Sequence, residues 1–150
     1  MLRIYLRPGG ESILANLCDI GFPGDLADYA RNQFVWVTQE EQTLGNTSWN
    51  FIRFPVHHTP ETDPHGYELT HKSGFRFLHC GDSGPCDEIE NRASTADVIL
   101  LEMGMPDIGD FPHHHRPSDV TSFSERHRDK VILVTHNFAS GANVDSGFRK

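Results

Sequence analysis

The sequence predicts an α/β fold in which antiparallel strands are followed by alternating strands and helices. Short segments rich in β-branched and aromatic residues recur between residues 34 and 79, and polar or glycine-bearing connections separate them. After Asp82, two continuous apolar segments at 96–103 and 130–136 enclose a region with helical features. No internal repeat or linker divides the chain, so residues 1–150 are a single domain or one part of a domain.

The N-terminal segment predicts a strand, a turn and a helix. Residues 2–6 (LRIYL) have the composition of a strand, and proline and glycine follow at once. A helix is expected behind a cap at Ser12, and Gly21 and Pro23 should end it. Its apolar residues recur at helical spacing, at Ile13, Leu14, Leu17 and Ile20.

The remaining elements follow from the same kinds of pattern. After Asp82 we expect a short helix and then a central strand at 96–103, buried on both faces. A Pro- and His-rich loop should lead to a helix from a cap at Ser118 to about Arg128, followed by another buried strand at 130–136. The expected antiparallel strands are 34–38, 51–56, 66–70 and 75–79.

Composition excludes some classes of function. The formal net charge of −8 argues against extended nucleic acid as a ligand, because nonspecific binding of phosphates needs concentrated positive charge. Three cysteines without zinc-finger spacing predict neither a disulfide framework nor a structural zinc site. No apolar run is long enough to cross a bilayer, so we expect no membrane association and a soluble, cytoplasmic chain. The 10 histidines, several of them in segments that read as loops, are the first indication of a metal.

Three segments place a metal-ligand residue type just after an apolar strand. These residues are His57 or His58 in FPVHHT, Asp82 in FRFLHCGDSG and His136 in VILVTHN. Strand ends are rigid platforms, so ligands placed there can converge at one edge of a sheet. Imidazole and carboxylate together suit zinc, manganese or iron. Each residue alone also fits an ordinary exposed loop or turn.

The order of these segments adds a family resemblance. PVHHT, GYEL, FRFLHCGDSGPCDEI, ADVILLE, HHRPSDV and VILVTH resemble the successive motifs of metallo-β-lactamase-fold hydrolases, notably transfer-RNA 3′-processing endonucleases and cyclic-phosphate phosphodiesterases. The resemblance implies the C-terminal half of an αββα metallo-β-lactamase sandwich. It also implies a two-metal site, with zinc or else manganese or iron, in which His58 binds one metal, Asp82 bridges both and His136 binds the second.

The resemblance also implies catalytic roles for Asp82 and His114. In the endonuclease branch, a His-Glu-Ala-Thr segment and a later His take part in proton transfer. This chain keeps Glu102 but has Leu101 where the first His stands, and the later His corresponds to His114. A His near the leaving group can protonate it, because its pKa lies close to neutrality. The alternative is that His113 to His115 form a solvated loop.

The His-x-His-x-Asp-His segment of this superfamily does not occur in the sequence. We therefore expect this chain alone to bind metal weakly, since catalytic zinc normally has three protein ligands plus water. We expect the missing part to lie before Met1. Either the chain is a split half whose partner supplies the first sheet, or it is a degenerate member retained for binding. Both interpretations predict association, as a homo-oligomer or with a complementing N-terminal half, because a half-sandwich exposes apolar surface.

The function expected is hydrolysis by metal-activated water. A small phosphodiester is the preferred substrate, because the branches that the motifs resemble act on phosphodiesters. Hydrolysis of lactones, thioesters or other esters remains open, because fold and metal do not fix the substrate. The alternative from another class is a non-catalytic, metal-free interaction domain.

Overall fold

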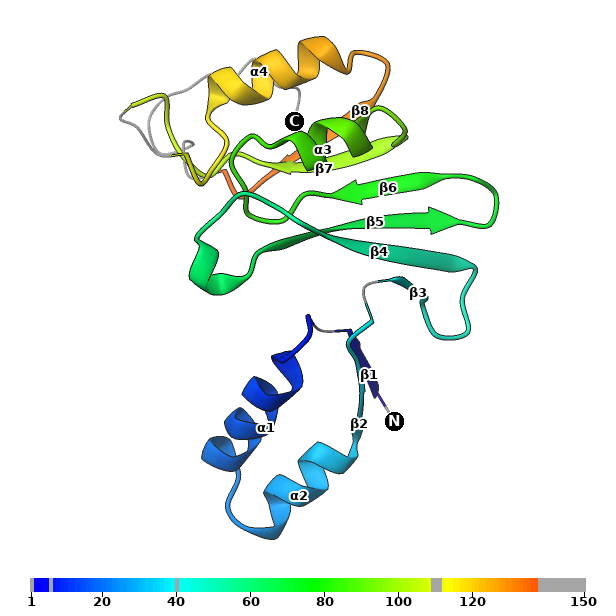
Figure 1. Ribbon diagram of the computed structural model, residues 1–150, viewed down its shortest axis with the longest axis vertical. Coiled ribbons are helices and arrows are strands. Elements are labelled where there is room, and N and C mark those ends of the chain that lie inside the picture. Colours follow the sequence, from blue (N-terminus) through cyan, green and yellow to red (C-terminus); the bar gives the residue numbers. More distant parts are fainter. Residues whose placement is uncertain (1, 6, 40, 109–111, 138–150) are drawn as a thin grey trace.

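The structure is a computed structural model that describes residues 2–5, 7–39, 41–108 and 112–137 (Figure 1). None of its described helices combines the length and apolar character needed to cross a membrane. In chain order the elements are β1 (Leu2–Tyr5), α1 (Gly10–Gly21), α2 (Asp25–Asn32), β2 (Phe34–Val37), β3 (Glu41–Thr43), β4 (Trp49–Pro55), the 3-10 helix η1 (Pro60–Thr62), β5 (His65–His71), β6 (Arg76–His79), α3 (Asp87–Ala93), β7 (Val98–Glu102), α4 (Pro117–Arg126) and β8 (Val131–Thr135).

Six strands form one mixed sheet in the order β3-β4-β5-β6-β7-β8. The pairs from β3 to β6 are antiparallel, whereas β6, β7 and β8 pair in parallel. The parallel connections pass through α3 and α4, as parallel pairing requires. The predicted change from antiparallel strands to alternating strands and helices is therefore confirmed.

The first two strands form a separate small sheet, which corrects one prediction. We expected segment 34–38 among the antiparallel strands, but β2 pairs in parallel with β1 instead. Helices α1 and α2 lie between them in the chain and make the crossover that a parallel pair needs. The unit lies at the end of the large sheet that carries β3 (Figure 1). The Tyr5 ring packs edge-on against Phe51 of β4, with the ring centroids 5.3 Å apart.

The main core lies between the large sheet and the two helices α3 and α4. Side chains that alternate along the central strands point to this side, because successive residues of a strand face opposite sides. The buried cluster joins sheet residues with Ile89 and Ala93 of α3 and with Val120 and Phe123 of α4. Its sheet members include Phe54, Leu78, Ile99 and Leu101.

The opposite face of the large sheet carries a second row of apolar side chains. Residues 130–136 were expected to form a strand buried on both faces, and this was wrong. Val131 and Leu133 of β8 are 56% and 48% exposed. Among the described strands β8 is an edge strand, and its core-facing neighbours Ile132 and Val134 pack against the buried cluster.

Two helix starts also differ from the sequence prediction. We expected α4 to begin at a Ser118 cap, but Arg116 is the N-cap and Pro117 is the first helical residue. The Asp119 carboxylate accepts the backbone N–H of Arg116 at 3.0 Å. Proline is favoured at the first position because its missing N–H has no helical partner there. Helix α1 begins after Gly9, and the Ser12 hydroxyl donates to the Gly9 carbonyl at 2.8 Å.

An ionic contact joins the two helices that cover the sheet. Glu90 of α3 forms an ion pair with Arg126 of α4 and lies 2.9 Å from His127 Nε2. Burial pushes the pKa of Glu90 upward, but the hydrogen bonds from Arg126 and His127 outweigh it and hold the pKa below its usual value. Because these hydrogen bonds stabilise the ionised Glu90 carboxylate only in the folded protein, they also stabilise the fold.

We expect Glu90→Gln to destabilise the protein by about 1 kcal/mol or less at neutral pH, since the pair is partly exposed. Because the folded-state pKa of Glu90 is lowered, its contribution is complete above the unfolded-state pKa. It disappears as the pH falls through the lower folded-state value. Urea unfolding of both proteins between neutral and acidic pH measures the difference. The exposed Glu61→Gln serves as the control, and a Glu90→Gln effect that grows on acidification would contradict the assignment.

Candidate metal centre

The direction of the strands brings several chemical groups to one edge of the large sheet. Because β5 is antiparallel to both of its neighbours, β4 and β6 run the same way, and β7 and β8 follow β6 in parallel. Their carboxyl ends therefore meet at one edge. His58 follows β4, Asp82 follows β6, Glu102 is the last residue of β7 and His136 follows β8.

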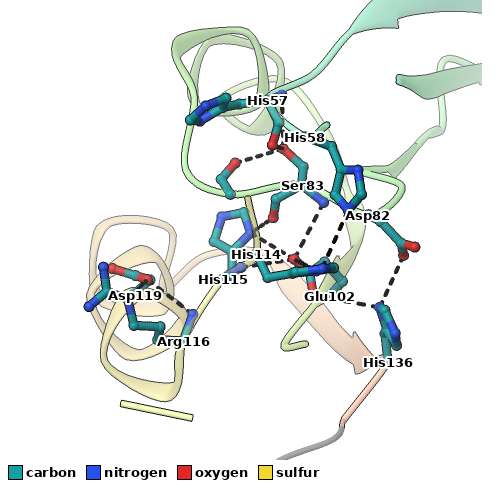
Figure 2. Close-up of polar contacts among 11 residues, drawn as sticks. His57, His58, Asp82, Ser83, Glu102, His114, His115, Arg116, Asp119 and His136 are labelled. Atoms are coloured by element: carbon teal, nitrogen blue, oxygen red, sulfur yellow. Dashed lines mark hydrogen bonds and ion pairs between the residues drawn. The ribbon is translucent and has the colours of Figure 1, made fainter. Parts of the chain in front are cut away.

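These groups form a continuous chain of contacts (Figure 2). His136 Nδ1 lies 3.1 Å from Asp82 Oδ1 and 3.8 Å from Glu102 Oε2. His114, from the loop that leads into α4, places Nδ1 at 3.2 Å from Glu102 Oε1. The Nε2 atoms of His114 and His58 are 3.3 Å apart. Three imidazoles and two carboxylates thus lie within one cluster.

The four site residues named from the sequence, His58, Asp82, His114 and His136, all lie in this cluster. His57 does not take part, because its exposed ring is directed away from the others (Figure 2). Its backbone instead forms a bridge with Gly84. Glu102 was not predicted as a ligand from the sequence. The sequence offers only a carboxylate at the end of the apolar strand VILLE, which does not by itself indicate a ligand.

Glu102 is the most buried of these groups, with no exposed surface. Its Oε1 accepts the backbone N–H of His115 at 2.8 Å and that of Ser83 at 3.3 Å, in addition to the His114 contact. Burial alone would raise the pKa of Glu102, but the hydrogen bonds that it accepts, those from His115 first, lower it below its usual value. Glu102 is therefore held as a carboxylate inside the protein.

The cluster fits a divalent metal ion. Ligand atoms of Glu102, His114 and His136 all lie within 4.8 Å of one another. Within the described residues, Glu102 Oε2 is fully buried and has no hydrogen-bond partner, which is the state expected of an oxygen that a cation would satisfy. His136 has a left-handed backbone with φ of 52°, a conformation uncommon outside glycine and often found at functional sites.

His58 is suited to act as a ligand at neutral pH. Burial lowers its pKa, and the neighbouring His114 lowers it further, whereas Asp82 and Glu102 act in the opposite direction with smaller effect. A lowered pKa keeps the imidazole neutral, and only the neutral ring offers a lone pair to a metal. Nitrogen and carboxylate donors together suit zinc, manganese or iron.

The comparisons with known proteins agree with this geometry. A family model described as the Beta-lactamase superfamily domain matches residues 2–137. A possible metal-dependent hydrolase from Veillonella parvula DSM 2008 superimposes with a TM-score of 0.61 at 14% identity, covering 90% of this chain and 52% of that one. A diphosphatase of the PhnP family gives 0.60 at 20% identity, covering 89% and 47%. Among curated proteins, no significant sequence match was found.

The metallo-beta-lactamase fold protein YhfI from Bacillus subtilis is a third similar structure, with a TM-score of 0.57 at 15% identity. The alignment covers 69% of this chain and 42% of YhfI. The chain therefore spans about half the length of these structures. At such identities the likeness establishes the metallo-β-lactamase fold, in which this chain supplies one part of the αββα arrangement.

Gly104 gives a direct test of the cluster. A Cβ atom at this position would lie 2.7 Å from Glu102 Oε2 and 2.7 Å from His114 Nδ1, closer than real Cβ contacts. We therefore expect Gly104→Ala to displace both side chains and weaken zinc binding about 10–100-fold, the usual effect of disturbing groups that orient ligands. Isothermal titration with zinc measures the change. Gly21→Ala is the matched control, because a Cβ there has no neighbour within 4 Å. Equal affinities for the two variants would contradict the placement.

Proposed function

The chain belongs to the beta-lactamase superfamily, and from that membership we propose that it is a metal-dependent hydrolase that cleaves small phosphodiesters in association with another polypeptide surface. The observation that supports this most strongly is the convergence of His58, Asp82, Glu102, His114 and His136 at one sheet edge. Two carboxylates and three imidazoles are the donors that catalytic metals use.

Within the proposal, His58, Asp82 and His136 hold the metals, and Glu102 is an additional candidate ligand through its unpartnered Oε2. A divalent metal bound there lowers the pKa of water and neutralises negative charge on the phosphoryl oxygens. Asp82 is the most exposed of the side chains that we place around the metal, with 59% of its surface accessible. Its carboxylate therefore faces the side from which solvent and substrate arrive.

His114 is the proposed proton donor. Glu102 Oε1 lies 3.2 Å from Nδ1 of His114 and, as a carboxylate, accepts a hydrogen bond from it, which fixes the proton on Nδ1 and orients the ring. The second nitrogen, Nε2, is then the atom that takes up a proton and returns it to the departing oxygen. The ring is 18% exposed, so a leaving group can reach it from solvent.

The choice of a phosphodiester rests on the motifs and on the fold shared with the PhnP-family diphosphatase. The net charge of −8 favours a small substrate over extended nucleic acid, because long polyanions would be repelled. Hydrolysis of carbon esters would use the same groups. The non-catalytic alternative has two supporting observations, which are the absence of a His-x-His-x-Asp-His segment from the sequence and Leu101 in place of the family's His.

We expect the chain, purified without a His tag and combined with the complementing N-terminal half, to bind zinc or manganese and to hydrolyse bis(p-nitrophenyl) phosphate faster than p-nitrophenyl acetate. Removing the proton donor with His114→Ala should lower kcat/KM about 10²–10⁴-fold. Asp82→Asn should reduce metal binding itself, measured by native mass spectrometry. His71→Gln is the control. His71 pairs with Trp49 at the start of β4, away from the metal centre, so the hydrolysis rate and metal binding should both stay unchanged. If the chain binds no metal, either alone or with the complementing N-terminal half, the result supports the non-catalytic alternative.

Association is proposed from the apolar face opposite α3 and α4. Besides Val131 and Leu133, this face holds an apolar hollow of about 300 Å³ next to the small β1–β2 unit. Patches of this kind on a soluble protein usually bind another surface. The hollow is lined by Tyr5, Leu44, Phe51, Tyr67, Leu69, Phe77 and His79.

We expect size-exclusion chromatography with light scattering to give a particle heavier than the 16.9 kDa chain. Leu133→Lys should shift it toward the monomer, because a charge would enter the apolar face. Ser122→Lys, on the exposed side of α4, adds the same charge as a control. If the chain is a monomer alone and gains mass only when the complementing N-terminal half is added, that half is the partner. A monomer under both conditions would contradict association.

A further inference from the structure

The segment 112–116 joins the parts of the chain that carry the proposed ligands. Within it His115 is only 2% exposed, although its neighbour His114 reaches the cluster. The ring nitrogen Nδ1 of His115 lies 2.5 Å from the carbonyl oxygen of Ser83, in the turn that carries Asp82. Its backbone N–H donates to Glu102 at 2.8 Å. One buried residue thus contacts both the Asp82 turn and the end of β7.

The backbone of this segment lies directly against that of the Asp82 turn. A Cβ on Gly84 would lie 1.7 Å from the Pro112 carbonyl oxygen and 3.4 Å from the His113 carbonyl carbon. No larger residue fits there without moving the segment. The close contact at Gly84 and the hydrogen bond from His115 to Ser83, which Figure 2 shows, therefore fix the same two pieces of chain at two points.

The chemistry of the His115 contact defines where its proton lies. A carbonyl oxygen only accepts hydrogen bonds, so Nδ1 of His115 must be the donor. Free neutral imidazole carries its proton mainly on Nε2. The Nδ1–H tautomer of His115 is therefore a measurable sign of its hydrogen bond to Ser83.

We propose that His115 is a positioning residue of the metal centre. Its hydrogen bond to Ser83 holds the Asp82 turn against the segment that carries His114, so that the carboxylates and imidazoles are assembled before a metal binds. His115 itself is not a ligand, since its Nδ1 is engaged and its ring is buried behind the cluster. The inference rests on the proposed function for its metal, but the hydrogen bond exists in the metal-free protein.

Three variants separate the hydrogen bond from the volume of the ring. In His115→Asn the side-chain amide places a donor close to the position of Nδ1, in His115→Gln the donor moves outward, and His115→Leu has none. We expect zinc affinity to stay within about threefold of wild type in the Asn variant. In the Gln and Leu variants it should fall about 10–100-fold, as for other residues that orient ligands.

A control separates positioning from stability. His127→Asn removes a second, nearly buried histidine that contacts Glu90 rather than the metal centre. It should lower the unfolding temperature without changing zinc affinity. The proposal would be overturned if zinc affinity in the His115 variants fell only in proportion to their unfolding temperatures. Equal loss of zinc affinity in the Asn and Gln variants would also overturn it.

Nitrogen-15 NMR of the metal-free protein tests the same contact without metal or substrate. We expect the resonances of His115 to report the Nδ1–H tautomer, and an Nε2–H tautomer would overturn the inference. If wild type shows the Nδ1–H form and binds zinc but cleaves no phosphodiester, the proposed function fails while the positioning role stands. If the protein cleaves phosphodiesters and the His115→Leu variant binds zinc as tightly as wild type, the positioning role fails while the proposed function stands.

Discussion

A single buried carboxylate, Glu102, is the constraint around which the site is arranged. Moving a carboxylate out of water costs several kcal/mol unless other groups pair with it and donate hydrogen bonds to it. Glu102 has no exposed surface, and one of its oxygens receives the backbone N–H groups of Ser83 and His115 and faces His114. Because those donors belong to separate segments, satisfying this one charge brings the Asp82 turn and the His114 loop together at the end of β7.

The charges of the cluster then favour a cation. Hydrogen bonds keep the pKa of Glu102 low, so it stays ionised, whereas burial lowers the pKa of His58 and keeps that ring neutral. The buried Oε2 of Glu102 has no hydrogen-bond partner among the described residues, and His136 Nδ1 lies 3.8 Å from it. A positive ion at this point would satisfy the oxygen and relieve the excess of negative charge, which no neutral ligand would do.

The sequence predicted the parts of this arrangement that depend on local pattern. Strand ends at His58, Asp82 and His136 could be located because apolar runs stop there. The role of Glu102 could not, since a glutamate at the end of a strand is ordinarily exposed, and its burial depends on donors that lie 12 to 19 residues away in the chain. The exposure of β8 was missed for a related reason. An apolar run is the same whether a strand lies inside a sheet or at its edge.

The two faces of the large sheet have separate roles. The face under α3 and α4 contains the buried core, and that core fixes the strands whose carboxyl ends carry the proposed ligands. The loop with His114 and His115 closes the cluster on the same side, because it leads directly into α4. Any group that an associated surface adds to the metal centre must therefore approach from the uncovered face. Association there would leave the alignment of the strand ends unchanged, since the core that sets it lies on the other side.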